Sequence, residues 1–349
     1  MPQSDPRRSG AIECYRFLFS VVVCLFHFRI KGNFPSPTGA FSAGYLGVEF
    51  FSIASGWFLM CSIQQGRAAQ EEGAEILHLV RSYAARRFVR LWPHYLLTLV
   101  LFVALRVFYL KTLTVGEFLE KGFFEIFMLQ SFGSSYVVML LWYVSALFLA
   151  SVLLYWLGSV LQDHLPILMA FAAPLIFSAF HVNYATVDHT MNPAVVGSLG
   201  LWRVFAGLGL GCAAACLGQR PARRRSPLVA SLWEAGLLLA LLLIMDRTYH
   251  SLWDFTAIAL LVLLVRSVLL GDSALSRLLD NDLSAFLGRI SYGSYLNQCF
   301  FLHLFGPVIP VRSYRSAAAL FLGLNFLLSI LTDRLARALA SLGQKLARP

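Results

Sequence analysis

The sequence has few charged residues: they occupy 13% of its 349 positions, whereas apolar residues occupy 58%. The mean hydropathy is +0.69, so the composition excludes an ordinary water-soluble domain and is typical of a membrane protein. The apolar runs are continuous over about 20 residues instead of alternating, which disfavours a β-barrel. We therefore predict an all-α, polytopic membrane protein with about ten transmembrane helices around a central cavity.

The sequence also lacks the short motifs of several enzyme and metal-binding classes. It has no C-x-x-C pair among its six cysteines, and no G-x-S-x-G, Walker or H-E-x-x-H motif. These absences leave no support for a zinc site, a disulfide framework, a P-loop or a Ser-His-Asp hydrolase. We expect reduced, buried cysteines and no metal. The polar residues of the loop 181–193 are explained by exposure to solvent better than by a metal site. The net charge of +10 fits basic loops between spans better than a nucleic-acid partner.

About ten apolar segments are long enough to cross a bilayer, and no loop between them is long enough to hold a soluble domain. We therefore predict a single membrane domain over residues 1–349. Residues 118–130 are too short and too charged to span, and we expect an interfacial or re-entrant helix there. The predicted spans are 11–30, 43–63, 88–110, 136–160, 165–182, 197–217, 228–246, 252–270, 285–306 and 315–340.

The distribution of Lys and Arg predicts the orientation. These residues are in excess on the side of the N-terminus, most clearly in the loop 219–227 (QRPARRRSP), for which a polyanion site is the alternative interpretation. The excess predicts that both termini of this multi-pass protein are cytoplasmic. The expected location is the cell inner (plasma) membrane. A cleaved signal peptide over 1–30 is disfavoured, because Arg16 interrupts its apolar core.

The first apolar segment carries three ionisable residues, Glu13, Arg16 and His27. Arg16 and His27 are eleven residues apart, which in a helix is three turns plus about 20° and a rise of about 16 Å. Both side chains therefore lie on one face, and Glu13 can pair with Arg16. Ionisable residues at this depth usually serve a function, and a neutral imidazole can act as a general base. A structural ion pair with a hydrogen-bonded histidine is the alternative.

Glu49 and the pair Arg87 and Arg90 extend this pattern to the next two segments. A carboxylate in lipid needs a cation or must be neutral, so we expect Glu49 to orient either His27 or an arginine. Arg87 and Arg90 are one helical turn apart and match a diphosphate, unless they are ordinary positive-inside anchors. Pro93 follows them and is expected to break the helix and open room for a ligand.

Two later segments carry further candidates. Arg203 lies among Gly207, Gly209 and Gly211, which suggests a lined cavity, with snorkelling of Arg203 as the alternative. Trp142 opens another span, where interface anchoring is its ordinary role. The segment 285–306 is unusually polar and is predicted to face a wet cavity or other helices.

Five motifs follow one another along the chain. They are R-x10-H at Arg16 and His27, an approximation of G-V-[DE]-x-F-F-x-x-S-G at 47–56, R-x-x-R at Arg87 and Arg90 before Pro93, L-W at Trp142, and L-G-x-x-S-Y-x-x-Y-L at 287–296. This ordered set resembles the membrane-bound acyltransferases that O-acetylate bacterial surface polysaccharides, often called acyltransferase family three. The resemblance covers nearly the full chain. Two positions depart from the family's pattern: Ala146 stands where it often has a glutamate, and Gln298 where it often has a histidine.

The resemblance implies an enzyme that moves an acetyl or other acyl group from cytoplasmic acetyl-CoA to a hydroxyl of a lipid-linked or exported glycan. The expected partners are acyl-CoA, a glycan or glycolipid acceptor and the lipid bilayer. A transporter or flippase for a glycan or small anion is the competing hypothesis, and a non-catalytic membrane anchor is a third. The predicted catalytic residues are His27, Arg16 and Glu49, and the predicted donor-binding residues are Arg16, Arg87, Arg90, Trp142 and Arg203.

Overall fold

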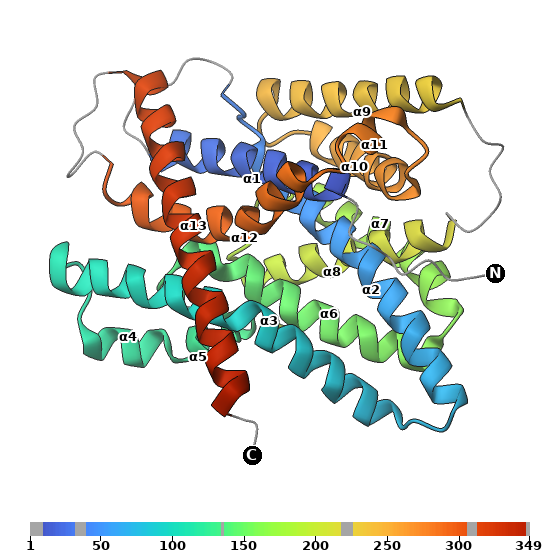
Figure 1. The fold of residues 1–349 in the computed structure, drawn as a ribbon, viewed down its shortest axis with the longest axis horizontal. Helices are drawn as coiled ribbons and strands as arrows, with labels where there is room; N and C mark the ends of the chain where they lie inside the picture. Colours follow the sequence, from blue (N-terminus) through green and yellow to red (C-terminus); the bar gives the residue numbers. More distant parts are fainter. Residues whose placement is uncertain (1–9, 32–39, 134–135, 218–225, 306–312, 347–349) are drawn as a thin grey trace.

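The computed structural model describes residues 10–31, 40–133, 136–217, 226–305 and 313–346, and these residues form helices joined by short connections (Figure 1). Their long helices are α1 (Gly10–Lys31), α2 (Gly47–Glu71), α3 (Ile76–Ala104), α6 (Trp142–Leu161), α7 (His164–Tyr184), α8 (Leu199–Leu217), α9 (Pro227–Arg247), α10 (Trp253–Leu270), α12 (Asp282–Leu302) and α13 (Tyr314–Leu346). The short helices are α4 (Val115–Lys121), α5 (Phe123–Ile126) and α11 (Ala274–Leu278), with single turns at Gly44–Leu46, Leu105–Tyr109, Gln130–Phe132 and Met139–Leu141.

Nine segments of the described chain are long and apolar enough to cross a bilayer, one fewer than the sequence predicts. The difference is α12, the segment predicted at 285–306, whose many polar side chains lower its hydropathy. It is 21 residues long and mostly buried among other helices, where polar side chains can be satisfied by protein instead of lipid. The all-α polytopic membrane fold is confirmed. Most of the predicted topology marker at 219–227 lies outside the described residues.

The third span begins twelve residues earlier than its apolar section predicts, at Ile76 instead of residue 88. It runs as one segment from Ile76 to Tyr109, and 34 residues of helix measure about 51 Å, well beyond the roughly 30 Å of hydrocarbon. Hydropathy detects only the part within lipid, so the charged first turns of α3 were missed. The predicted break at Pro93 is wrong, because the helix continues through it.

Helices α1 and α12 run side by side in the same direction. Gly10 at the start of α1 contacts Asp280, just before α12. Further along, the Cys24 thiol lies 3.6 Å from the Ser294 carbonyl oxygen. Helix α13 crosses over α12 and also contacts α3 (Figure 1). The polar helix α12 is thus enclosed by α1, α3 and α13.

Glycines let α2 and α8 come into backbone contact. A Cβ added to Gly56 would lie 2.0 Å from the Leu208 carbonyl oxygen, and one added to Gly211 would lie 2.0 Å from the Ile53 carbonyl oxygen. Such close approach is what small residues permit between membrane helices. The prediction that glycines beside Arg203 line a cavity is therefore wrong: they make room for a neighbouring helix.

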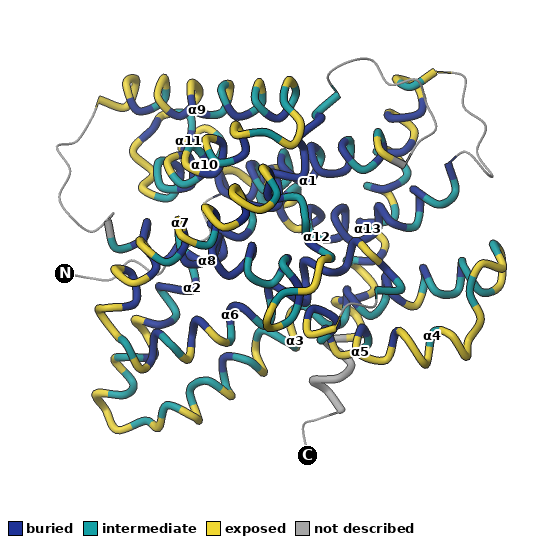
Figure 2. The backbone as a smooth tube through the Cα atoms, turned by 180° about the vertical axis from the view of Figure 1, so that it is seen from behind, coloured by how far each residue is buried: buried dark blue, intermediate teal, exposed yellow. Residues whose placement is uncertain are grey.

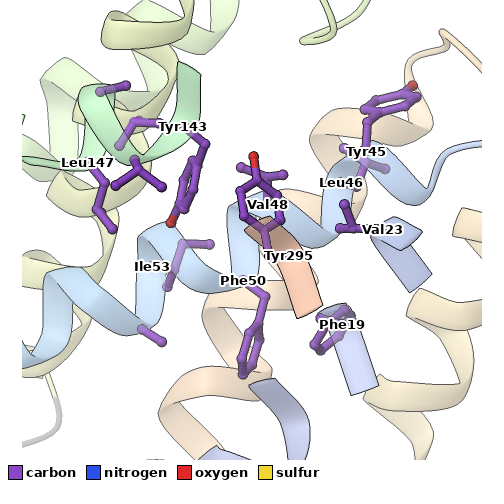
Figure 3. Packing of buried hydrophobic residues seen from close by; sticks show 14 of the residues in the cluster. Phe19, Val23, Tyr45, Leu46, Val48, Phe50, Ile53, Tyr143, Leu147 and Tyr295 are labelled. Atoms are coloured by element: carbon purple, nitrogen blue, oxygen red, sulfur yellow. The ribbon is translucent and has the colours of Figure 1, made fainter. Parts of the chain in front are cut away.

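Burial divides the bundle into a centre and a periphery. In α2 and α8, 72% of the apolar window is buried, against 28% in α9 and α13, so α9 and α13 leave most of their apolar surface to face lipid. Figure 2 shows the same contrast along the backbone. The central core includes Phe19 and Phe50, whose rings stack where α1 meets α2 (Figure 3).

The segment predicted as an interfacial or re-entrant helix forms the short helices α4 and α5. Thr114 and Glu117 close a capping box at the start of α4, which fixes this helix end without tertiary contacts. In α5, Glu125 is buried and accepts hydrogen bonds from the backbone N–H groups of Val137 and Val138. Burial raises the pKa of Glu125 to about 7, against the lowering effect of these donors.

Candidate functional site

A cavity of about 560 Å³ opens between α1, α2, α3 and α6. Among the residues that the structure describes, its lining holds four arginines and no acidic side chain: Arg16, Arg86, Arg87 and Arg90. Guanidinium groups bind phosphate oxygens in paired, charge-assisted hydrogen bonds. A concentration of like charge without carboxylates is therefore suited to a polyanion.

Arg87 is the arginine of this cavity whose surroundings are best defined. Its NH1 group donates to the Tyr83 hydroxyl at 3.1 Å, and Tyr83 stacks on Tyr155 with ring centroids 4.2 Å apart. These contacts position the guanidinium. Its Nε–H is buried and has no hydrogen-bond partner in the structure, although buried donors are normally paired. An anion in the cavity could accept this hydrogen bond.

A second cavity, of about 370 Å³, shares several lining residues with the first. Both contain Arg16, Ser55 and Arg90, so the two spaces adjoin one another. Arg16 is paired with Glu13 at 3.2 Å, which confirms the predicted pairing within α1. The second cavity is more balanced in charge, with Glu13 and Asp333 among its lining residues.

One face of α12 forms a wall of the second cavity. Gly288, Ser291, Tyr292 and Tyr295 all line it, at the i, i+3, i+4 and i+7 spacing of a single helical face. This confirms that the polar ninth segment faces a cavity. The aromatic ring of Tyr143, from α6, meets that of Tyr295 edge to face, with the ring centroids 5.6 Å apart (Figure 3). These two rings border the far end of the cavity.

His27 lies beyond this end. Its Nδ1 is 3.1 Å from Oε1 of Gln298, and Gln298 continues the same face of α12 one turn after Tyr295, a rise of about 4.5 Å. His27 is half-buried, and within the described part of the chain it is not in the lining of either cavity. The α12 face therefore leads from the arginines to the residue that contacts His27.

Glu49 and Arg203 form a separate, closed cluster. Their side chains are 0% and 1% exposed. Arg203 Nε donates to Glu49, and Arg203 NH2 donates to the Tyr45 carbonyl oxygen at 3.0 Å. The guanidinium carbon also lies 5.8 Å from the Trp142 ring centroid. Of the two partners expected for Glu49, the structure places an arginine beside it.

The structure thus groups the predicted residues in three places. Arg16, Arg87 and Arg90 share the first cavity, His27 lies past the end of the second, and the closed cluster holds Glu49, Trp142 and Arg203. Sequence reasoning does not find further lining residues, among them Arg86, Arg289 and Arg337, because basic residues at helix ends are also typical of membrane topology. The small and hydroxyl-bearing residues of α12 did carry a signal, through their helical spacing.

The fold and site together define a polytopic helical membrane protein with an arginine-rich cavity that extends along a polar helix. A family model described as an acyltransferase domain, acyltransferase family 3, matches residues 9–334. The chain belongs to this family and is a membrane acyltransferase. No curated protein and no solved structure matches it.

Proposed function

We propose that the protein is an O-acyltransferase that moves an acetyl group from cytoplasmic acetyl-CoA to a hydroxyl of a lipid-linked or exported cell-surface glycan. The observation that supports this most is the continuity between the four-arginine cavity and the α12 face that reaches Gln298 and His27. An acyl donor with phosphates at one end and a thioester at the other fits such an arrangement.

The donor is assigned to the arginine cavity. Coenzyme A carries a diphosphate and a 3′-phosphate. The cavity offers the neighbouring guanidiniums of Arg86 and Arg87 and, one turn of α3 later, that of Arg90. Arg16 stands where the two cavities adjoin, so it can contact the diphosphate while the pantetheine arm extends along α12. This orientation assigns the arginine end to the cytoplasmic side, in agreement with the excess of basic residues there.

The chemistry is assigned to His27. As a general base, it takes the proton of the acceptor hydroxyl while the oxygen forms a bond to the thioester carbonyl carbon. The C–S bond then breaks, and the proton passes to the departing CoA thiolate. In the covalent variant, the imidazole nitrogen attacks the thioester carbonyl carbon and the C–S bond breaks to release the CoA thiolate. The acceptor oxygen then displaces the imidazole from the acyl group, and the hydroxyl proton goes to the thiolate. Glu49, Trp142 and Arg203 support the fold in this proposal, and their predicted direct roles stay predictions.

The test is acyl transfer by the purified protein in lipid nanodiscs, combined with mass spectrometry of the glycans of a deletion strain. The wild-type chain should bind acetyl-CoA and restore one acetyl mass to the glycan. His27→Ala should keep acetyl-CoA binding and lose roughly 100- to 10,000-fold in transfer. His303→Ala is the matched control, because His303 is also half-buried and bonds the Cys299 carbonyl oxygen.

A folded His27→Ala protein with normal transfer would refute both mechanisms. A wild-type protein that binds no acetyl-CoA but moves a glycan or small anion across vesicles would support the transporter hypothesis instead.

A further inference from the structure

The contact between His27 and Gln298 is made by a side chain that is fully buried and bonded at both ends. Gln298 is 0% exposed. Its Nε2 donates to the Tyr295 carbonyl oxygen at 2.7 Å, and its Oε1 is 3.1 Å from His27 Nδ1. A buried amide with both ends engaged has little freedom to turn.

The partners of Gln298 decide which way its amide faces. A backbone carbonyl oxygen can only accept a hydrogen bond, so the amide nitrogen must point to Tyr295 and the amide oxygen to His27. The amide oxygen is itself only an acceptor, and His27 Nδ1 must therefore carry the proton. In a neutral imidazole, the lone pair that can accept a proton is then on Nε2.

We propose that Gln298 is a positioning residue that holds His27 in the Nδ1–H tautomer and makes Nε2 the basic nitrogen. This inference rests on the proposed function, since a basic Nε2 matters only if His27 reacts. The hydrogen bond also fixes the ring about its own axis, as the orienting partner of a catalytic histidine does.

The position of Gln298 on α12 supports this role. Ser291 and Tyr295 precede it at i−7 and i−3 spacing on one helical face, and both line the second cavity. The face of α12 that lines the second cavity therefore ends at Gln298, the side chain that orients the His27 imidazole. A change in α12 would move the cavity wall and the histidine partner together.

Asn297 provides a matched control on the same helix. It is 1% exposed and is bonded at both ends, accepting from Thr98 at 2.8 Å and donating to Thr332 at 2.8 Å. Its partners do not include His27. If the amide of Gln298 were only structural, its substitution would have the same effect as the substitution of Asn297.

The first measurement is the ring ¹⁵N NMR spectrum of histidine-labelled protein in nanodiscs, with the His27 signals identified by their loss in His27→Asn. The inference predicts a protonated Nδ1 and an unprotonated Nε2 in the wild type and in Asn297→Leu. An Nε2–H tautomer in an active wild-type enzyme would overturn this inference and leave the proposed function standing. Failure of the wild type to transfer acetyl groups would overturn the proposed function, and the positioning role with it.

The second measurement is steady-state acetyl transfer, normalised to the fraction of protein that binds acetyl-CoA. Gln298→Leu removes the acceptor and should lower kcat roughly 10- to 100-fold at unchanged KM for acetyl-CoA. Gln298→Glu keeps an acceptor for Nδ1–H and should retain at least about tenfold more activity than Gln298→Leu. Asn297→Leu should lower stability but not kcat. Equal kcat in Gln298→Leu and wild type would overturn the inference. If Gln298→Leu does not fold, the comparison uses Gln298→Glu instead. An activity loss in Gln298→Glu as large as that in His27→Ala would then overturn the inference.

Discussion

Two groups of arginines lie within this bundle, and they differ in what surrounds them. Arg203 is buried, and its partners are Glu49, the Tyr45 carbonyl oxygen and, at 3.6 Å, the Asp188 carboxylate. Arg87, on α3, lines a cavity of about 560 Å³ and has a buried Nε–H with no partner. Both stood out in the sequence for the same reason, as charges in or near apolar helices.

The comparison distinguishes a guanidinium whose charge is balanced by a buried carboxylate from one with a buried donor left over for a ligand. Burying a guanidinium is expensive unless its donors are satisfied. Around Arg203 the protein itself satisfies them, so the residue holds α8 to α2. In the first cavity, the buried Nε–H of Arg87 has no partner, and a bound anion would accept its hydrogen bond.

The largest expected effect comes from breaking the closed pair. Arg203→Leu leaves the Glu49 carboxylate buried without its cation, which should destabilise the fold by about 3–5 kcal/mol. Thermal unfolding in detergent, followed by gel filtration, should show a large loss of folded protein. Removal of both charges in Arg203→Met with Glu49→Leu should restore much of the stability. Normal acetyl-CoA binding by that folded double variant would sharpen the distinction between the two groups.

A double variant that folds well but binds no acetyl-CoA would contradict this distinction. It would support the donor-binding role that the sequence predicted for Arg203 and the catalytic role that it predicted for Glu49.

Sequence periodicity and hydropathy were sufficient to predict the helical membrane fold and the pairing of Glu13 with Arg16, because both depend on local spacing. The first turns of α3 were missed because they extend beyond the apolar section. The partner of Glu49 could not be predicted, since Arg203 is 154 residues away and only packing brings them together. The same holds for Gln298, which looked like a departure from a motif until the structure placed it 3.1 Å from His27.

A smaller effect is expected where α2 and α8 touch. Gly56→Ala places a methyl group 2.0 Å from the Leu208 carbonyl oxygen, and because backbone must move to admit it, the variant should be destabilised by about 1–3 kcal/mol. Gly236→Ala in α9 is the control, since a Cβ there meets no atom within 4 Å; in a helix it should be neutral or slightly stabilising. Equal unfolding temperatures for the two variants would show that the closed cluster does not depend on this close approach.

The smallest effect is expected at the open cavity, where single arginines have neighbours of the same charge. Arg87→Ala should weaken acetyl-CoA binding about tenfold, or about 1.4 kcal/mol, because one charge-assisted contact is lost while others remain. Arg90→Ala should act in the same direction, and neither change should lower the unfolding temperature as Arg203→Leu does. Arg81→Ala is the matched control, an exposed arginine of α3 outside the cavity lining. Titration calorimetry in nanodiscs measures all three affinities, and unchanged binding in both Arg87→Ala and Arg90→Ala would refute the assignment of the donor to this cavity.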